Sequence, residues 1–243
     1  MATAPSEIKG RRSDGLFFFP AVVILVGDIF TPTDNPEDIH MDFNDILERR
    51  RAINFFDPSQ DVPDDLLRTV LAEAGKAPSS FNLQPWKVKV VRDPERKAAL
   101  RALAFDQAKV TEAPVVLIVL ADQDGWKEGN PTFEGHFKHN MKPEQRDYLV
   151  NSAKALYGGS PDASLAFATK NAGLFAMSFM YAACAHGLDT HPMDGFDRDA
   201  VRKEFNIPDN YWLAMLIAVG HRTPDLVVHP KAWRQSVDEM ILK

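Results

Sequence analysis

The sequence predicts a single domain in which an interior β-sheet is covered by helices on both faces. The main evidence is the run Pro114–Leu120, which is continuously apolar and rich in β-branched residues. Such a run is typical of a strand that is buried on both faces. Hydrophobic residues make up 45% of the 243 positions, so the chain can bury a core of the size that this arrangement requires.

Helices and one further strand are expected before this central strand. In order, they are a helix from Asp42 to Arg49–Arg51, a helix from Pro63 to Gly75, a half-buried strand from Trp86, and a helix from Asp93 to about Ala104. The helices follow from apolar residues at helical spacing, and the strand follows from alternating polarity. Pro63 suits a first helical turn and Gly75 suits a helix end.

Less regular segments follow the central strand. They are an excursion at 122–160, a long helix from Asp162 or Ser164 to His186, a tight loop at His191–Phe196, a strand at Tyr211–Val219 and an amphipathic end at Val237–Leu242. The excursion lacks clear periodicity and is either a lid over a site or a peripheral helical layer. The long helix is apolar on all sides, so we expect it to be buried in its own subunit or in a subunit interface.

Charge, cysteine and histidine content exclude several classes of function. The formal net charge is −6 without long runs of one sign, which does not suggest a surface for nucleic acid. A single cysteine, Cys184, excludes an intramolecular disulfide framework and fits a reducing compartment. His136 and His139 lie three residues apart without a third ligand at fixed spacing, so we expect no metal site.

The first forty residues are expected to form an extension outside the domain, which then covers residues 41–243. Lys9, Arg11 and Arg12 precede an apolar stretch, Leu16–Val26, as in a secretory signal. No small-residue cleavage pattern follows, and the stretch is shorter than the ~20 residues of a membrane-spanning helix. We therefore favour a poorly ordered extension over a membrane or export signal, and we expect the protein in the cytoplasm.

A polar turn at Ala77–Trp86 is the strongest candidate for a binding segment. Two prolines, Pro78 and Pro85, restrict its backbone at either end. The polar side chains between them are those of Ser79, Ser80, Asn82 and Gln84. Their hydroxyl and amide groups can donate to and accept from a flat polar ligand. Ordinary loops have similar composition, so this interpretation depends on the rest of the chain.

The sequence lacks the common nucleotide-binding and hydrolase motifs. No G-x-G-x-x-G follows a strand, and neither a P-loop nor a G-x-S-x-G elbow is present. Three basic or polar clusters remain: Arg50-Arg51, Ser79-Ser80-Asn82, and Lys231 with Arg234. Arginine binds phosphate oxygens in bidentate fashion. A flavin mononucleotide (FMN) joins one phosphate to a polyol and a flat ring with a polar edge, which matches these clusters.

Taken together, the segments from Phe43 to the C-terminus resemble the nitroreductase family of FMN-dependent oxidoreductases. Pro78–Trp86 is similar to the most specific signature of that family, and Arg50–Asp57 is similar to its opening motif. The resemblance implies that FMN is bound by Arg50, Arg51, Ala52, Asn54, Pro78, Ser79, Ser80, Asn82, Asp106, Gln107, Lys109, Pro192, Met193, Asp194, Gly195, Lys231 and Arg234.

The resemblance also assigns these residues to parts of the flavin. Phosphate would contact Arg50, Arg51 and Lys231, and the ring and polyol would contact Ser79, Ser80 and Asn82. The segment Phe105–Val110 would meet the pyrimidine edge. The loop Pro192–Asp197 would lie against the reactive ring nitrogen, with the hydrogen bond supplied by the backbone at Asp194 and Gly195.

Three positions depart from the family pattern. Ala52 replaces a usual serine, and Asn54 stands where a cation usually faces the pyrimidine edge of the flavin. A cation there would stabilise the anionic reduced flavin, so Asn54 leaves that form less stabilised unless Lys109 or another cation compensates. Arg234 lies one residue later than the usual arginine, and Trp233 occupies that place, so the phosphate contact of Arg234 is the weakest of these inferences.

The fold implied by the resemblance is α+β, with a central, mostly antiparallel sheet flanked by helices on both faces and an intertwined homodimer. FMN would lie at the subunit interface. One chain would contribute the turn at Pro78–Trp86, and the other would contribute Arg50-Arg51. A symmetric interface of this kind could also bury the long apolar helix.

The implied activity is hydride transfer from NADH or NADPH through FMN to an electron-poor acceptor such as a nitroaromatic or a quinone. The two half-reactions alternate in one pocket, and no side chain acts as a catalytic acid or base. Phe133 or Phe137 would line the acceptor pocket. Two alternatives stay open: specialised family chemistry, namely reductive dehalogenation or oxygen-dependent flavin breakdown, and a non-catalytic flavin-binding protein.

Overall fold

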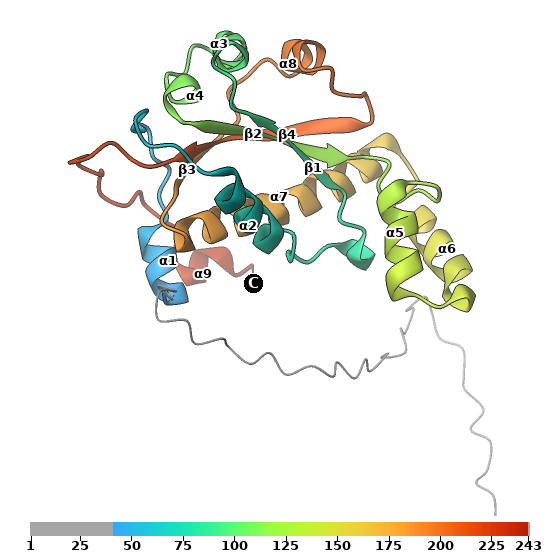
Figure 1. Ribbon diagram of the computed structural model, residues 1–243. Coiled ribbons are helices and arrows are strands. Elements are labelled where there is room, and N and C mark those ends of the chain that lie inside the picture. Colours follow the sequence, from blue (N-terminus) through green and yellow to red (C-terminus); the bar gives the residue numbers. More distant parts are fainter. Residues whose placement is uncertain (1–40, 243) are drawn as a thin grey trace, which may run out of the picture. The chain divides into compact units, whose positions relative to one another are not determined.

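Four antiparallel strands form the central sheet of the protein, whose residues 41–242 are described by a computed structural model (Figure 1). The strands are β1 (Trp86–Val91), β2 (Val115–Asp122), β3 (Asp189–Met193) and β4 (Tyr211–Gly220), and their order across the sheet is β1-β2-β4-β3. Each neighbouring pair runs antiparallel. The α+β class and the antiparallel sheet expected from the sequence are therefore confirmed.

Every residue of β2 is buried, as its continuous apolar run predicts. Successive side chains of a strand point to opposite faces of the sheet. Val115, Leu117 and Val119 accordingly lie in one hydrophobic cluster, whereas Val116 and Ile118 lie in the other. The single strand therefore joins two cores, one on each side of the sheet.

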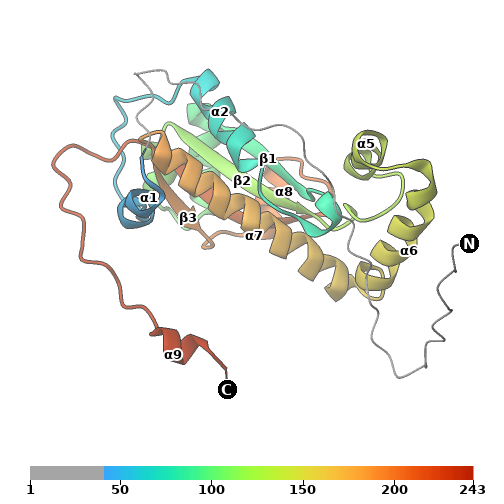
Figure 2. The same ribbon diagram turned by 90° about the horizontal axis from the view of Figure 1, so that it is seen from below.

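Helices cover both faces of the sheet. Figure 1 shows α2 (Asp64–Ala74) and α7 (Pro161–Ala185) on one face, and α3 (Pro94–Leu103), α4 (Lys109–Glu112) and α8 (Arg198–Glu204) on the other. Figure 2 shows α2 and α7 side by side over the first of these faces. Helices α3 and α8 begin where their capping residues predict. The carboxylates of Asp93 and Asp197 accept hydrogen bonds from backbone amides one turn later. The strand order places β1 and β3 at the two edges of the sheet.

The long helix α7 begins slightly earlier than expected and is buried on one side only. Its cap is Ser160 rather than Asp162 or Ser164, since the Ser160 hydroxyl accepts a hydrogen bond from the amide of Ala163. Phe175 and Phe179 of α7 pack in the core, while Leu174 is 42% exposed. In a single chain, part of the apolar surface of this helix is therefore exposed to solvent.

Two further segments differ from the sequence expectations. The predicted loop at His191–Phe196 begins as strand, because β3 continues to Met193 and pairs with β4. Pro192 is compatible with β3 because this strand lies at the sheet edge, where a missing N–H is tolerated. The alternation expected from Trp86 places Val90 of β1 on the buried face. Val90 is 40% exposed, and the next residue, Val91, is buried in the second core.

The excursion at 122–160 is mainly helical and contains α5 (Pro131–Asn140) and α6 (Arg146–Tyr157). The buried carboxylate of Asp122, at the end of β2, accepts hydrogen bonds from the side-chain amides of Asn130 and Asn210. Asn130 in turn caps α5. This anchor gives α5 a defined start beside the end of the sheet.

The two ends of the domain are the short helices α1 (Phe43–Arg49) and α9 (Val237–Met240). α9 has no buried residue. The extension at 1–40, including Leu16–Val26, lies outside the described residues. Within residues 41–242, no helix is long and apolar enough to cross a bilayer.

Replacing Phe179 of α7 with alanine should lower the free energy of unfolding by about 3–5 kcal/mol, because a fully buried ring would leave a cavity between helix and sheet. Urea unfolding followed by circular dichroism measures this change. Leu156→Ala on α6 is the matched control, since Leu156 is 57% exposed and its loss should change stability by less than about 0.5 kcal/mol. Equal losses in the two variants would contradict the assignment of the core.

Candidate functional site

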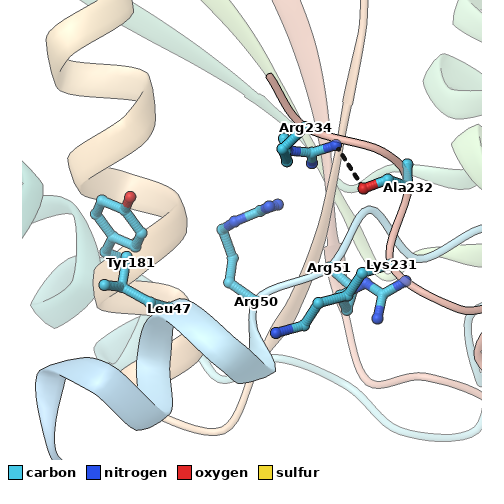
Figure 3. Close-up of a pocket in the computed structure, with 7 residues that line it drawn as sticks. All are labelled: Leu47, Arg50, Arg51, Tyr181, Lys231, Ala232 and Arg234. Carbon is cyan, nitrogen blue, oxygen red and sulfur yellow. Dashed lines mark hydrogen bonds between the residues drawn. The ribbon is translucent and has the colours of Figure 1, made fainter. Parts of the chain in front are cut away.

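Four cationic side chains converge on one cavity at the end of α1. Arg50, Arg51, Lys231 and Arg234 line this cavity of ≈ 210 Å³ together with Leu47, Tyr181 and Ala232 (Figure 3). The sequence expectation placed the first three at a phosphate and Arg234 there only weakly, and the structure brings all four together. Guanidinium and ammonium groups gathered in this way suit an anion such as phosphate.

Two of these cations also connect the C-terminal segment at 229–231 to α1 and the residues that follow it. The guanidinium of Arg51 donates to the carbonyl oxygens of His229 (2.7 Å) and Pro230 (3.1 Å), and Lys231 forms an ion pair with Glu48. The side chain of Arg50 extends instead toward Arg234 (Figure 3). Arg50 is therefore the cation of this group best placed to meet an anion.

Tyr181 is a lining residue that the sequence reasoning missed. It lies on α7 and contacts Phe43 of α1 edge to face, with ring centroids 5.6 Å apart. Its hydroxyl can donate to an anion bound in the cavity. A hydroxyl-bearing ring in an otherwise apolar helix was the available signal.

A second group of predicted residues meets around β3. Residues 52–54 run beside β3 through a bridge between Ala52 and Thr190, and the amide of Ile53 donates to the Thr190 carbonyl oxygen (3.1 Å). The side-chain amide of Gln107 donates to the carbonyl oxygen of Gly195 (2.8 Å). The segments at 52–54, 106–109 and 192–195 thus lie together, as expected of one binding site.

Side chains in the 192–195 loop point in different directions. Met193 is buried in the core, whereas the exposed carboxylate of Asp194 pairs with Arg198. A Cβ atom added to Gly195 would approach no heavy atom nearer than the Gln107 amide nitrogen at 3.5 Å, an ordinary contact. The protein itself therefore does not require glycine there.

Left-handed backbone conformations occur in two of the predicted binding segments. Phe81, Asn82 and Gln84 have φ values of 52°, 54° and 45°, and Phe105 and Asp106 have values of 52° and 58°. Such conformations in non-glycine residues cost energy and are concentrated at functional sites. Phe105 is also 70% exposed, which is unusual for a large apolar side chain.

A side chain of α7 is hydrogen-bonded to the backbone of the polar turn. Asn171, a fully buried residue, accepts a hydrogen bond from the Ser80 amide (3.0 Å) and donates to the carbonyl oxygen of Phe167 (2.7 Å). Within the turn, the amide of Gln84 donates to the hydroxyl of Ser79 (3.0 Å). Asn171 was not identified from the sequence, although a lone amide in an apolar helix was a usable signal.

The turn is also connected to the excursion. The side-chain amides of Asn82 and Asn140 lie 3.2 Å and 3.3 Å from Nδ1 of His136. Because both amide nitrogens are donors, Nδ1 accepts, and the proton of the neutral ring is on Nε2. Burial lowers the pKa of His136, which favours this neutral form. No cluster of three potential metal ligands occurs among the residues that the structure describes.

Only one of the two predicted acceptor-pocket residues reaches the surface. Phe133 is fully buried in the core beside α7, whereas Phe137 is partly exposed under the guanidinium of Arg146, 4.7 Å from its ring centroid. Phe133 therefore supports the base of α5. A role of Phe137 at the acceptor stays a prediction.

The turn lies far from residues 52–54 of the same chain. Ala52 is bridged to Thr190, which pairs through Val219 to Val115 at the start of β2. Trp86 pairs with Ala121, six residues further along β2, which is roughly 20 Å at ~3.4 Å per residue. β1 and β3 are also opposite edges of the sheet. The turn and residues 52–54 are therefore separated within one chain.

Comparison with known proteins gives a consistent result. The nitroreductase family matches residues 47–221, a range that ends before Lys231 and Arg234. An NADH dehydrogenase of Thermus thermophilus is 35% identical over 176 residues, covering 71% of this chain and 83% of the relative. Nitroreductase NfnB of Mycolicibacterium smegmatis is 28% identical over 209 residues, covering 78% and 87%.

A solved structure shows the same similarity in three dimensions. It is that of an Exiguobacterium sibiricum protein assigned as a nitroreductase, in complex with FMN. The TM-score is 0.73 at 28% identity, and the match covers 83% of this chain and 96% of the other.

Replacing Asn171 with alanine should lower the free energy of unfolding by about 1–3 kcal/mol, because the partly buried Ser80 amide would lose its acceptor. Urea unfolding measures the loss. Thr169→Ala on the same helix is the control, since the Thr169 hydroxyl bonds only within α7. If Asn171→Ala is no worse than the control, Asn171 does not support the turn.

Stability should fall as pH is lowered through the range below the ordinary histidine pKa of about 6.5. The lowered pKa of folded His136 means that the unfolded chain binds the proton more readily, so its contribution is complete above that pKa and is lost below it. Urea midpoints at pH 7.5 and pH 5.5 test this. The fall should be smaller in His136→Gln and unchanged in His139→Gln, and identical falls in all three proteins would contradict it.

Proposed function

The chain belongs to the nitroreductase family, and on that premise we propose that it is an FMN-dependent oxidoreductase that passes hydride from NADH or NADPH to an electron-poor small molecule. The observation that supports the cofactor most directly is the cavity lined by Arg50, Arg51, Lys231 and Arg234. The naming of the Thermus relative as an NADH dehydrogenase supports the electron donor, and the FMN complex of the Exiguobacterium protein supports the cofactor.

The residues present fit each part of FMN. The cationic cavity suits its phosphate, and the backbone and polar groups at 52–54, 106–109 and 192–195 suit a flat ring with a polar edge. The hydroxyls and amides of Pro78–Gln84 suit the polyol and ring. In this proposal the cofactor contacts are those named from the resemblance, and residues 41–243 form the FMN-binding domain.

We propose a homodimer because the two parts of the site are separated within one chain. A twofold partner can place its turn against the Arg50 side of this chain, and the reverse contact then follows from symmetry. Exposed apolar side chains near the Arg50 cavity are consistent with such an interface, since Phe43 is 58% and Leu47 is 43% exposed. Leu174 of α7 adds a third exposed apolar side chain.

The residues of this chain bind and orient rather than transfer protons. FMN, when bound, supplies the redox chemistry. Arg50 and its cationic neighbours hold the phosphate, and the backbone at Asp194 and Gly195 orients the ring. Packing by the turn of the partner excludes water from one face, while the open face receives the two substrates in turn. Phe137, under Arg146, is the proposed wall of the acceptor pocket.

The test of this proposal begins with the purified chain. It should take up one FMN per subunit on reconstitution and oxidise NADH or NADPH when a nitroaromatic or a quinone is present. Heat-denatured protein with free FMN is the control. A chain that gains no FMN, or that binds FMN without accepting hydride from either nicotinamide, would contradict the proposed function.

Replacing Arg50 with alanine should weaken FMN binding about 10- to 100-fold, as expected for one lost charge-assisted hydrogen bond. Riboflavin, which lacks the phosphate, should bind the variant and the parent equally. Fluorescence titration of both ligands gives the two ratios. Arg68→Ala, at an exposed position of α2, should leave both affinities unchanged. An equal loss for riboflavin and FMN would remove Arg50 from the phosphate site.

A further inference from the structure

His191 connects two of the proposed flavin-binding segments through its two ring nitrogens. It lies in β3 and is partly buried. Its Nδ1 is 2.9 Å from the carbonyl oxygen of Ile53, and its Nε2 is 3.4 Å from Nζ of Lys109 in α4. The imidazole ring therefore spans the space between the residue before Asn54 and the ammonium of Lys109.

These contacts define the protonation state of the ring. A carbonyl oxygen only accepts, so Nδ1 of His191 carries the proton. An ammonium only donates, so Nε2 must be the unprotonated acceptor of a neutral ring. An imidazolium would instead direct a second N–H at the Lys109 ammonium. Burial is the main cause that lowers the pKa of His191, and the charge of Lys109 is the second. Both agree with a neutral ring.

Lys109 bonds to His191 although a carboxylate lies nearer along the helix. Glu112 is three residues further on in α4, at a spacing that permits an ion pair. Oε2 of Glu112 is nevertheless buried without a hydrogen-bond partner. Among residues 41–242, the recorded polar contact of the Lys109 ammonium is with a neutral ring, so its charge is not cancelled by a bonded carboxylate.

The Lys109 ammonium lies where solvent screens its charge only weakly. Burial lowers the pKa of Lys109, while the charge of Glu112 opposes that effect, so the ammonium is partly removed from water. An interaction between charges is less screened in such a place than in bulk solvent. Through Gln107 and Gly195, the segment carrying Lys109 is also bonded to the loop proposed to face the flavin ring.

We propose that His191 is a positioning residue that holds the Lys109 ammonium, to which no carboxylate of residues 41–242 is hydrogen-bonded, beside the flavin-binding segments and thereby stabilises the reduced, anionic flavin. This inference rests on the proposed function. It assigns a role to a histidine that directly precedes the Pro192–Gly195 loop. It also gives a source for positive charge in a site where Asn54 supplies none.

The first experiment is a double-mutant cycle on the midpoint potential of bound FMN. His191→Phe keeps the ring volume but removes both hydrogen bonds, so Lys109 can turn toward Glu112 or solvent. We expect the ratio of reduced to oxidised FMN affinity to fall roughly tenfold, the effect of one charge at about 10 Å with an effective dielectric constant near 20. For a two-electron couple this is a shift of about 30 mV to more negative potential.

Lys109→Gln should produce the same shift, and His191→Phe should add nothing in the Lys109→Gln background. His186→Asn, at the C-cap of α7 and paired with Glu73, is the control and should leave the potential unchanged. Circular dichroism establishes that each variant is folded, and His191→Asn replaces His191→Phe if the latter is not. Equal shifts by His191→Phe in both backgrounds would overturn the proposal, because His191 would then act independently of Lys109.

The second experiment needs no variant to remain active. Nitrogen-15 NMR of the wild-type protein without flavin should show His191 as the neutral Nδ1-protonated tautomer at pH 7. An Nε2-protonated ring or an imidazolium at that pH would overturn the proposal. Failure of the proposed function is distinguishable, since it appears as a wild-type protein that binds no FMN, whereas failure of this inference appears in a protein that binds FMN normally.

Discussion

Burial of β2 on both faces is the constraint on which the rest of the structure depends. Its alternating side chains enter two cores, so helices must cover both sides of the sheet. Its neighbour β4 pairs with it from Val115 to Asp122, and β1 pairs with it from Val116 to Ala121. That length then separates the polar turn before β1 from residues 52–54, which bridge the start of β3. In the proposed shared site, the same strand that holds the domain together would thus keep these two parts of one chain apart.

Helix α7 joins these distant parts. Near its middle, buried Asn171 fixes the backbone of the turn, and near its C-terminal end, Tyr181 lines the cationic cavity. Between them Leu174 is exposed, so this helix has apolar surface that its own chain does not cover. In the proposed dimer, the helix that supports both parts of the site would also contribute to the surface that brings two copies together. This links cofactor binding to association in physical terms, because loss of either would leave polar groups and apolar surface exposed.

Much of the fold could be predicted from local patterns, whereas the contacts that build the site could not. The buried run of β2 and the caps at Asp93 and Asp197 are local signals, and the structure has them as expected. β3 was missed because Pro192 and Gly195 indicate a loop, while an edge strand tolerates a proline. The buried position of Phe133 and the partners of Asn171 and His191 depend on residues tens of positions away, about which local periodicity carries no information.

Subunit mixing tests the central claim, a site shared between two chains, most directly. Arg50→Ala and Asn82→Ala chains, each carrying a different tag, are combined by co-expression, and the mixed dimers are purified through both tags and titrated with FMN. A shared site predicts that one of the two sites in each mixed dimer is intact and binds FMN with wild-type affinity, while the other carries both changes. Mixed dimers in which both sites bind as weakly as in the parent variants would show that each chain completes its own site, and would contradict the account.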